Sequence, residues 1–164
     1  MSTVSRMQKS FDWLALLGFF ALCFAAAAIG VWLTGDAIDS WYRGLNKPSF
    51  NPPNWVFGPA WTVLYSMMAV AAWLVWRERG RRDVTVPLAL FGVQLALNAA
   101  WSGIFFGMQN PSAALVEIAF LWLAIAATLV AFFRVRPLAG WLLAPYLAWV
   151  AFASVLNFEI WRLN

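Results

Sequence analysis

The sequence predicts an all-α membrane protein, a bundle of five transmembrane helices, on three grounds. Hydrophobic residues make up 63% of the 164 residues and charged residues only 11%, whereas an ordinary soluble domain carries about 25% charged residues. Five apolar runs are each long enough to cross about 30 Å of hydrocarbon. The runs also lack the polar–apolar alternation of barrel strands. Because the runs are similar and the chain is short, we expect one domain over residues 1–164.

The apolar runs predict helices at residues 13–33, 56–76, 84–108, 113–133 and 138–161, with one long loop at 34–55. The first run follows basic residues and contains small ones, as a signal peptide does. It is 21 residues long, however, and a signal peptide has an apolar core of about 7–15 residues. We therefore interpret it as a retained helix. Pro87 and Pro145 lie early in the third and fifth runs, so they are weak evidence of broken helices.

Most Lys and Arg residues fall on one side of the predicted bundle. Eight lie before the first run or in the second and fourth connections, and three lie on the opposite side. For a bacterial cell membrane, the positive-inside rule then predicts a cytoplasmic N-terminus and an outer long loop. The net charge of +4 is spread between the runs, without the basic patch that is typical of nucleic-acid binding.

Histidine and cysteine usage excludes several kinds of chemistry. The chain has no histidine, and its single cysteine, Cys23, lies inside the first run. An intrachain disulfide, a Ser-His-Asp triad and histidine-ligated haem are therefore excluded. We expect no metal site and no required cofactor.

The connection 34–55 is unusually long. Loops beyond about 12–15 residues are uncommon in compact domains, and many are lids or binding loops. Pro48, Pro52 and Pro53 restrict the backbone and make this loop stiff. Two interpretations remain open: a linker whose tryptophans anchor at the membrane interface, and an aromatic lid over a cavity. The crowding of aromatic residues between 42 and 61 favours the lid.

Polar and aromatic residues share one face of the third run. Gln94, Asn98, Trp101 and Phe105 recur at helical spacing. A buried amide in a membrane either hydrogen-bonds across helices or lines a cavity. Both roles remain open for Gln94, whereas the position of Asn98 beside Trp101 favours a pocket.

The second and fifth runs carry aromatic stripes of their own. They consist of Trp61, Tyr65 and Met68 in the second run, and Tyr146, Trp149, Ala153 and Leu156 in the fifth. Such stripes are more often packing surfaces than ligand sites. Three of them beneath a stiff lid nevertheless predict a site for a large, flat, apolar ligand.

Two acids and two glycines complete the candidates. Glu117 and Glu159 lie near the ends of their runs, where ionisation is tolerable, so we interpret them as structural. Gly103 and Gly107 are four residues apart, a spacing that lets helices approach closely. The approach can lie within the chain or between chains, and we favour a homodimer.

Four stretches together resemble the TspO family of tryptophan-rich sensory proteins, whose animal relatives are the mitochondrial translocator proteins, or peripheral benzodiazepine receptors. The stretches are WYRGLNKPSFNPPNWVFGPAWTVLY, QLALNAAWSGIFFG, ALVE and PYLAWVAFASVLNFEIWRLN. The resemblance implies a five-helix bundle, often dimeric, that binds protoporphyrin IX and other tetrapyrroles. In some members it also implies binding of sterols and isoquinoline drugs.

The resemblance assigns the pocket, by motif position, to eight residues. These are Tyr42, Trp61, Asn98, Trp101, Ser102, Trp149, Ala153 and Leu156. It further implies that Trp61 and Trp149 are catalytic if this chain degrades porphyrin in light and oxygen, as some bacterial members are reported to do. Ala113 replaces a tryptophan usual in animal members, and Phe158 replaces the tyrosine of their sterol motif. These departures weaken the expectation of drug and sterol binding more than that of porphyrin binding.

Three functions follow from these observations. A tetrapyrrole-binding sensory or regulatory membrane protein is favoured, and without histidine we expect metal-free porphyrin rather than haem. A porphyrin-degrading enzyme is an alternative, although the sequence supplies no base–nucleophile pair or metal site. A porphyrin or sterol transporter is the third, but five spans cannot form two equal repeats within one chain.

Overall fold

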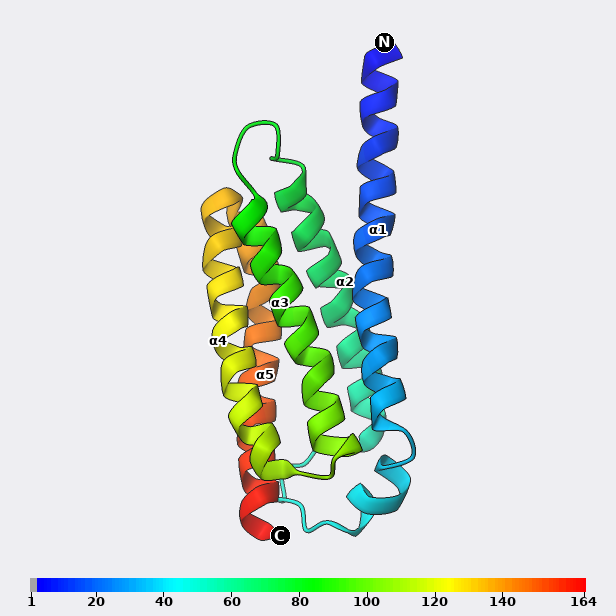
Figure 1. The fold of residues 1–164 in the computed structure, drawn as a ribbon, viewed down its shortest axis with the longest axis vertical. Coiled ribbons are helices and arrows are strands. Elements are labelled where there is room, and N and C mark those ends of the chain that lie inside the picture. The colour runs from blue at the N-terminus through cyan, green and yellow to red at the C-terminus, as the bar shows by residue number, and fades with distance from the viewer. Residues whose placement is uncertain (1–2) are drawn as a thin grey trace.

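Five long helices run side by side in the computed structural model, which describes the backbone of residues 3–164 and the side chains from residue 12 onward (Figure 1). They are α1 (Thr3–Thr34), α2 (Phe57–Trp76), α3 (Thr85–Ser102), α4 (Pro111–Val135) and α5 (Pro137–Leu163). Each lies in a helical segment long and apolar enough to span a membrane. No strand occurs within residues 3–164. The predicted fold class, an all-α bundle of five transmembrane helices, is confirmed.

The first helix begins earlier than predicted. Hydropathy placed it at 13–33, but helical backbone starts at Thr3, and its apolar part is Asp12–Thr34. Apolarity marks the segment that lies in the membrane, whereas helical hydrogen bonds continue into the polar residues before it. In Figure 1 the N-terminal part of α1 stands clear of the other helices.

Prolines set the starts of the last two helices. α4 begins at Pro111 and α5 at Pro137, one or two residues before the predicted starts. A proline fits the first helical position because that N–H has no intrahelical partner. Asn110 caps α4, since its Oδ1 accepts a hydrogen bond from the backbone N–H of Ala113 at 3.1 Å.

The third helix changes its winding near its end. α3 stops at Ser102 rather than at the predicted residue 108, and the chain continues as the π-helical turn η3 (Gly103–Gly107). The helical span as a whole, Thr85–Gly107, agrees with the predicted 84–108; apolarity alone does not distinguish α from π winding.

The long connection predicted at 34–55 contains two short helical turns, which its proline-rich sequence did not indicate. η1 (Ile38–Tyr42) is π-helical, and η2 (Asn54–Val56) is a 3-10 turn that leads into α2. Gly35 separates α1 from η1 with a φ of +54°, a conformation that favours glycine. Its N–H donates to the carbonyl of Val31 at 3.2 Å and so closes the last turn of α1.

The helices pack as a closed ring. Each packs mainly against two neighbours, in the order α1, α2, α5, α4, α3 and back to α1, and α2 also touches α3 and α4. Residues 35–56 and the C-terminus lie at one end of the bundle, and the α2–α3 connection lies at the other (Figure 1). We call these the loop end and the arginine-rich end, because the second carries the arginines of residues 77–82 and 134–136.

The packing leaves apolar surface on the outside as well as the inside. Trp32, for example, is 79% exposed, a state that is stable where lipid rather than water surrounds the bundle. The chain is therefore an integral, multi-pass membrane protein. The buried cluster draws on all five helices, with Cys23, Met68, Phe91, Ile125 and Leu143 as one member from each.

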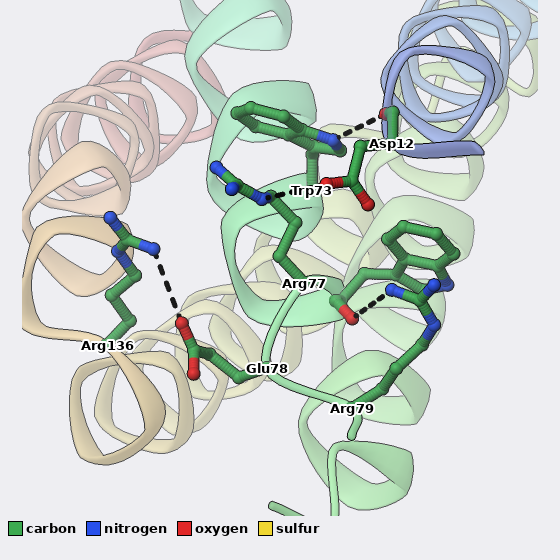
Figure 2. A network of polar contacts seen from close by, with 7 residues as sticks. Asp12, Trp73, Arg77, Glu78, Arg79 and Arg136 are labelled. Carbon is green, nitrogen blue, oxygen red and sulfur yellow. Dashed lines mark hydrogen bonds and ion pairs between the residues drawn. The ribbon is translucent and has the colours of Figure 1, made fainter. Parts of the chain in front are cut away.

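Polar contacts fasten the helices together at the arginine-rich end (Figure 2). The Trp73 indole N–H donates to the Asp12 carbonyl at 2.7 Å, and Arg77 pairs with the Asp12 carboxylate at 3.5 Å. Arg136 pairs with Glu78 at 3.3 Å. These pairs are partly exposed, so each stabilises only modestly. Together they join α1 to the end of α2, and the α2–α3 connection to the α4–α5 connection.

The helix pair α4–α5 approaches most closely at a glycine. A Cβ added to Gly140 would lie 2.9 Å from the backbone Cα of Phe133. A backbone atom cannot rotate away, so this contact requires glycine.

We expect Gly140→Ala to lower the free energy of unfolding by about 1–3 kcal/mol, because the added methyl overpacks the α4–α5 contact. The measurement is thermal unfolding in detergent. Gly92→Ala in α3 is the matched control, since nothing lies within 4 Å of its added Cβ, and it should unfold at or slightly above the wild-type temperature. Equal unfolding temperatures for the two variants would contradict the close approach.

Candidate ligand-binding cavity

A cavity of about 520 Å³ lies inside the ring of helices, towards the loop end. Its volume falls within the roughly 300–1,000 Å³ of small-molecule sites. Helices α1, α2, α3, α4 and α5 and the connection after α1 all contribute to its wall, which is mainly aromatic and aliphatic. Among the described residues, no charged side chain lines it.

All eight residues that the sequence assigned to the pocket line this one cavity. They are Tyr42, Trp61, Asn98, Trp101, Ser102, Trp149, Ala153 and Leu156. The structure thus brings together residues from the loop and three helices. Their part in binding stays a prediction.

Asn98 joins three helices on the cavity wall. Its Oδ1 accepts a hydrogen bond from the Tyr65 hydroxyl at 2.8 Å, and its Nδ2 donates to the Tyr146 hydroxyl at 2.7 Å. All three side chains are buried, where an unpaired polar group is costly. The amide therefore holds α2, α3 and α5 in one register and keeps one N–H free of these two bonds.

A second amide, Asn157, fixes the neighbouring indole. Trp101 Nε1 donates to Asn157 Oδ1 at 3.1 Å, and Asn157 Nδ2 donates to the carbonyl of Pro111 at 2.8 Å. Asn157 is only 1% exposed and lines the cavity, yet sequence reasoning missed it. Two features of the sequence could have indicated Asn157: it is an amide inside an apolar run, and it lies four residues after Ala153, on the same helix face.

Tyr42 forms part of the roof at the loop end. Its ring packs edge-on against Phe105 and Phe106, and its hydroxyl donates to Asn51 Oδ1 at 3.0 Å. Burial raises the pKa of the Tyr42 hydroxyl, an effect that the hydrogen bond to Asn51 partly opposes. Lys47 Nζ lies 4.7 Å from the centre of the same ring, a cation–π distance.

The loop is also tied to the end of α5. The Asn46 N–H donates to Asn164 Oδ1 at 2.9 Å, and Asn164 Nδ2 donates back to the Asn46 carbonyl at 3.0 Å. Phe50 packs against Phe152 of α5 with ring centres 6.3 Å apart. Trp55, in contrast, is 75% exposed. Both interpretations of the loop therefore have a structural counterpart: Tyr42 faces the cavity, and Trp55 faces outward.

Comparison with known proteins agrees with this architecture. The TspO/MBR family profile matches residues 19–162. The chain belongs to the TspO/MBR family. It is 45% identical to the human translocator protein over 155 residues, covering 93% of this chain and 91% of the relative. It is 46% identical to the tryptophan-rich protein TspO of Chlorobaculum tepidum over 162 residues, covering 96% and 99%. It is 45% identical to the tryptophan-rich sensory protein of Cereibacter sphaeroides, and the aligned region covers 93% of each chain.

Helix α1 of this TspO/MBR protein supplies a wall that sequence reasoning missed. Phe24, Gly30 and Thr34 line the cavity, although the run 13–33 carries no polar stripe that would have indicated it. Gly30 lets α1 approach α3, because a Cβ there would lie 3.3 Å from Ser102 Oγ.

The two glycines predicted at a dimer interface face α1 of the same chain. Added Cβ atoms would lie 3.3 Å from Leu33 Cδ1 at Gly103 and 2.9 Å from the Leu33 carbonyl oxygen at Gly107. The intrachain alternative thus accounts for both small residues. A homodimer stays a prediction.

Other sequence candidates lie outside the cavity. Glu159 pairs with Arg162 at 2.6 Å, a structural role. The Glu117 carboxylate and the Gln94 amide are buried, with no hydrogen-bond partner among the described residues. The sequence left two roles open for Gln94, a hydrogen bond to another helix or a place on the cavity wall. Within the described residues the structure shows neither.

Two amides one helical turn apart allow a matched stability test. Asn98→Leu should lower the free energy of unfolding by about 1–3 kcal/mol or more, because the Tyr65 and Tyr146 hydroxyls lose their partner. Gln94→Leu should be neutral or stabilising, because no described bond is lost. Thermal unfolding in detergent measures both. An equal loss in Gln94→Leu would show that Gln94 has a partner, such as a bound water.

Proposed function

We propose that this protein binds protoporphyrin IX or a related tetrapyrrole in the cavity and acts as a sensory or regulatory membrane protein. The observation that carries the proposal is the convergence of Trp61, Trp101 and Trp149 on one uncharged cavity. A flat aromatic macrocycle gains from stacking on indoles, and each aromatic pair contributes about 0.5–1.5 kcal/mol beyond its buried area. The name of the Cereibacter sphaeroides relative, tryptophan-rich sensory protein, supports the sensory part of the proposal.

The polar groups suit a ring with acidic substituents. Because no charged side chain of the described residues lines the cavity, the carboxylates of a porphyrin are expected at the loop end. Lys47 lies there beside Tyr42. Inside, the remaining Asn98 N–H and the Ser102 hydroxyl are available to the ring nitrogens or to a substituent. Sterols and isoquinoline-type drugs are further candidates for the same apolar space.

Light-dependent porphyrin breakdown is the second candidate function. It is favoured by one observation, that the indoles of Trp61 and Trp149 both face the cavity. Oxidation of a bound, illuminated porphyrin by oxygen would occur beside these rings, and Trp61 is in turn 5.5 Å from the Tyr65 ring centre. Transport of the ligand is a third use of the same site.

The proposal is tested by titrating the purified protein with protoporphyrin IX in the dark and following tryptophan fluorescence. Wild type should show saturable quenching. Ala153→Leu places extra carbon in the cavity and should weaken binding about tenfold or more, since overpacking costs about 1–3 kcal/mol. Ala119→Leu, on the exposed face of α4, is the matched control and should bind like wild type.

The same samples separate the candidate functions. Under light, one outcome is that wild type loses the porphyrin absorption spectrum while Trp61→Phe and Trp149→Phe keep it. That result would show that the protein breaks down porphyrin and that both indoles are required. Saturable binding without loss would leave a sensor or carrier. Absence of saturable quenching in wild type would overturn the porphyrin proposal.

We further propose that the arginine-rich end faces the cytoplasm of a bacterial cell. Ser40→Cys at the loop end should react with an impermeant maleimide in intact cells, and Gly80→Cys should not. Cys23 is fully buried, so background labelling is expected to be low. The reverse pattern would refute the orientation.

The proposed homodimer is tested by the mass of the purified protein. Light scattering corrected for detergent should give twice the chain mass, and a monomer mass would exclude the dimer under those conditions.

A further inference from the structure

A second hollow lies on the outer surface of the bundle, between α2 and α5. It has a volume of about 810 Å³ and is lined only by apolar residues, including Ala60 and Val63 of α2 and Ala148 and Phe152 of α5. Val63 is 57% exposed, and both helices are membrane spans. The groove therefore opens towards lipid.

Among the residues whose side chains the structure describes, only Trp149 lines both this groove and the inner cavity. Helix α2 separates them elsewhere, since Ala60 and Val63 face the groove while Trp61 and Tyr65 face the cavity. On the α5 side, the indole of Trp149 separates the groove from the cavity, and we call it the partition.

This partition is held only by apolar contacts. The Trp149 ring packs against Phe57 and Phe152, with ring centres 6.0 and 5.8 Å apart, and its N–H makes no hydrogen bond within the described residues. Trp101, on the opposite wall, is fixed by its bond to Asn157. Rotation of the Trp149 side chain thus breaks no hydrogen bond.

The backbone beside Trp149 is also easier to bend. Pro145 lies one turn earlier in α5 and lines the same groove. A proline removes the N–H that would bond to the carbonyl four residues before it, so the helix loses one internal restraint on its groove side. The loop at the other end of the cavity, by contrast, is held in place by the buried Tyr42 and by the two Asn46–Asn164 hydrogen bonds.

We propose that a flat apolar ligand dissolved in the bilayer first occupies the α2–α5 groove and then passes Trp149 into the cavity. The inference rests on the proposed function, because the ligand is the one proposed for the cavity. It adds the route: sideways from lipid, with the Trp149 indole as the moving partition, rather than through the loop roof.

The test uses the full chain in phosphatidylcholine vesicles, with protoporphyrin IX supplied from donor vesicles of the same lipid. Tryptophan quenching gives association and dissociation rates. Ala148→Phe fills the groove at a residue that does not line the cavity. Both rates should fall about tenfold while the equilibrium Kd stays within about threefold of wild type, as expected when only a gate is obstructed. Ala119→Phe on the lipid face of α4 is the control and should leave both rates unchanged.

A second variant tests the competing route. Asn164→Ala unties the loop from α5, and the lateral route predicts unchanged rates. Faster exchange in Asn164→Ala, or wild-type rates in Ala148→Phe with binding intact, would overturn the route and leave the proposed function standing. Absence of saturable binding in wild type would remove both.

Discussion

The cavity depends on Asn98 having partners on two other helices. In a hydrocarbon environment an unpaired amide is costly, so the Tyr65 and Tyr146 hydroxyls set the rotation of α2, α3 and α5 about their axes. That rotation turns Trp61 and Trp101 inward. Because these three polar groups bond to one another, the surrounding wall consists mainly of aromatic and aliphatic side chains. A hydrogen-bonded bridge of three side chains thus specifies the orientation of an otherwise apolar site.

The two sides of the cavity differ in how firmly they are held. On the α3 side, amides fix the wall: Asn98 bonds across helices and Asn157 bonds Trp101. On the outer part of the α2–α5 side, contacts are between rings and aliphatic groups. Hydrogen bonds are directional and resist rotation, whereas apolar contacts tolerate sliding. The α3 wall of the cavity is therefore the more rigid one, and the α2–α5 wall, where we propose that the ligand enters, is the less restrained.

The loop end of the cavity is built from chain segments distant in sequence. Residues 35–56 cover the bundle, but they stay in place through contacts with α5 and η3, namely the Asn46–Asn164 pair and the Tyr42–Phe105 packing. Stiff prolines alone would set the shape of this loop without setting its position. Gly35, at φ +54°, supplies the change of direction that begins it.

The sequence by itself determined the fold class, the approximate spans and the grouping of eight residues, because apolar length, helical spacing and family motifs are local properties. Tertiary structure decided the rest. The spacing of Gly103 and Gly107 is compatible with a contact to a second chain and with a contact inside the chain. Only the packed structure shows that both lie against Leu33 of the same chain. The sequence of α1 has no polar stripe that would indicate a site. The helix nevertheless lines the cavity, because it packs between α2 and α3. Gln94 and Asn98 look alike on one face, but only Asn98 meets two hydroxyls. Partners across helices are set by three-dimensional register, which no single segment contains.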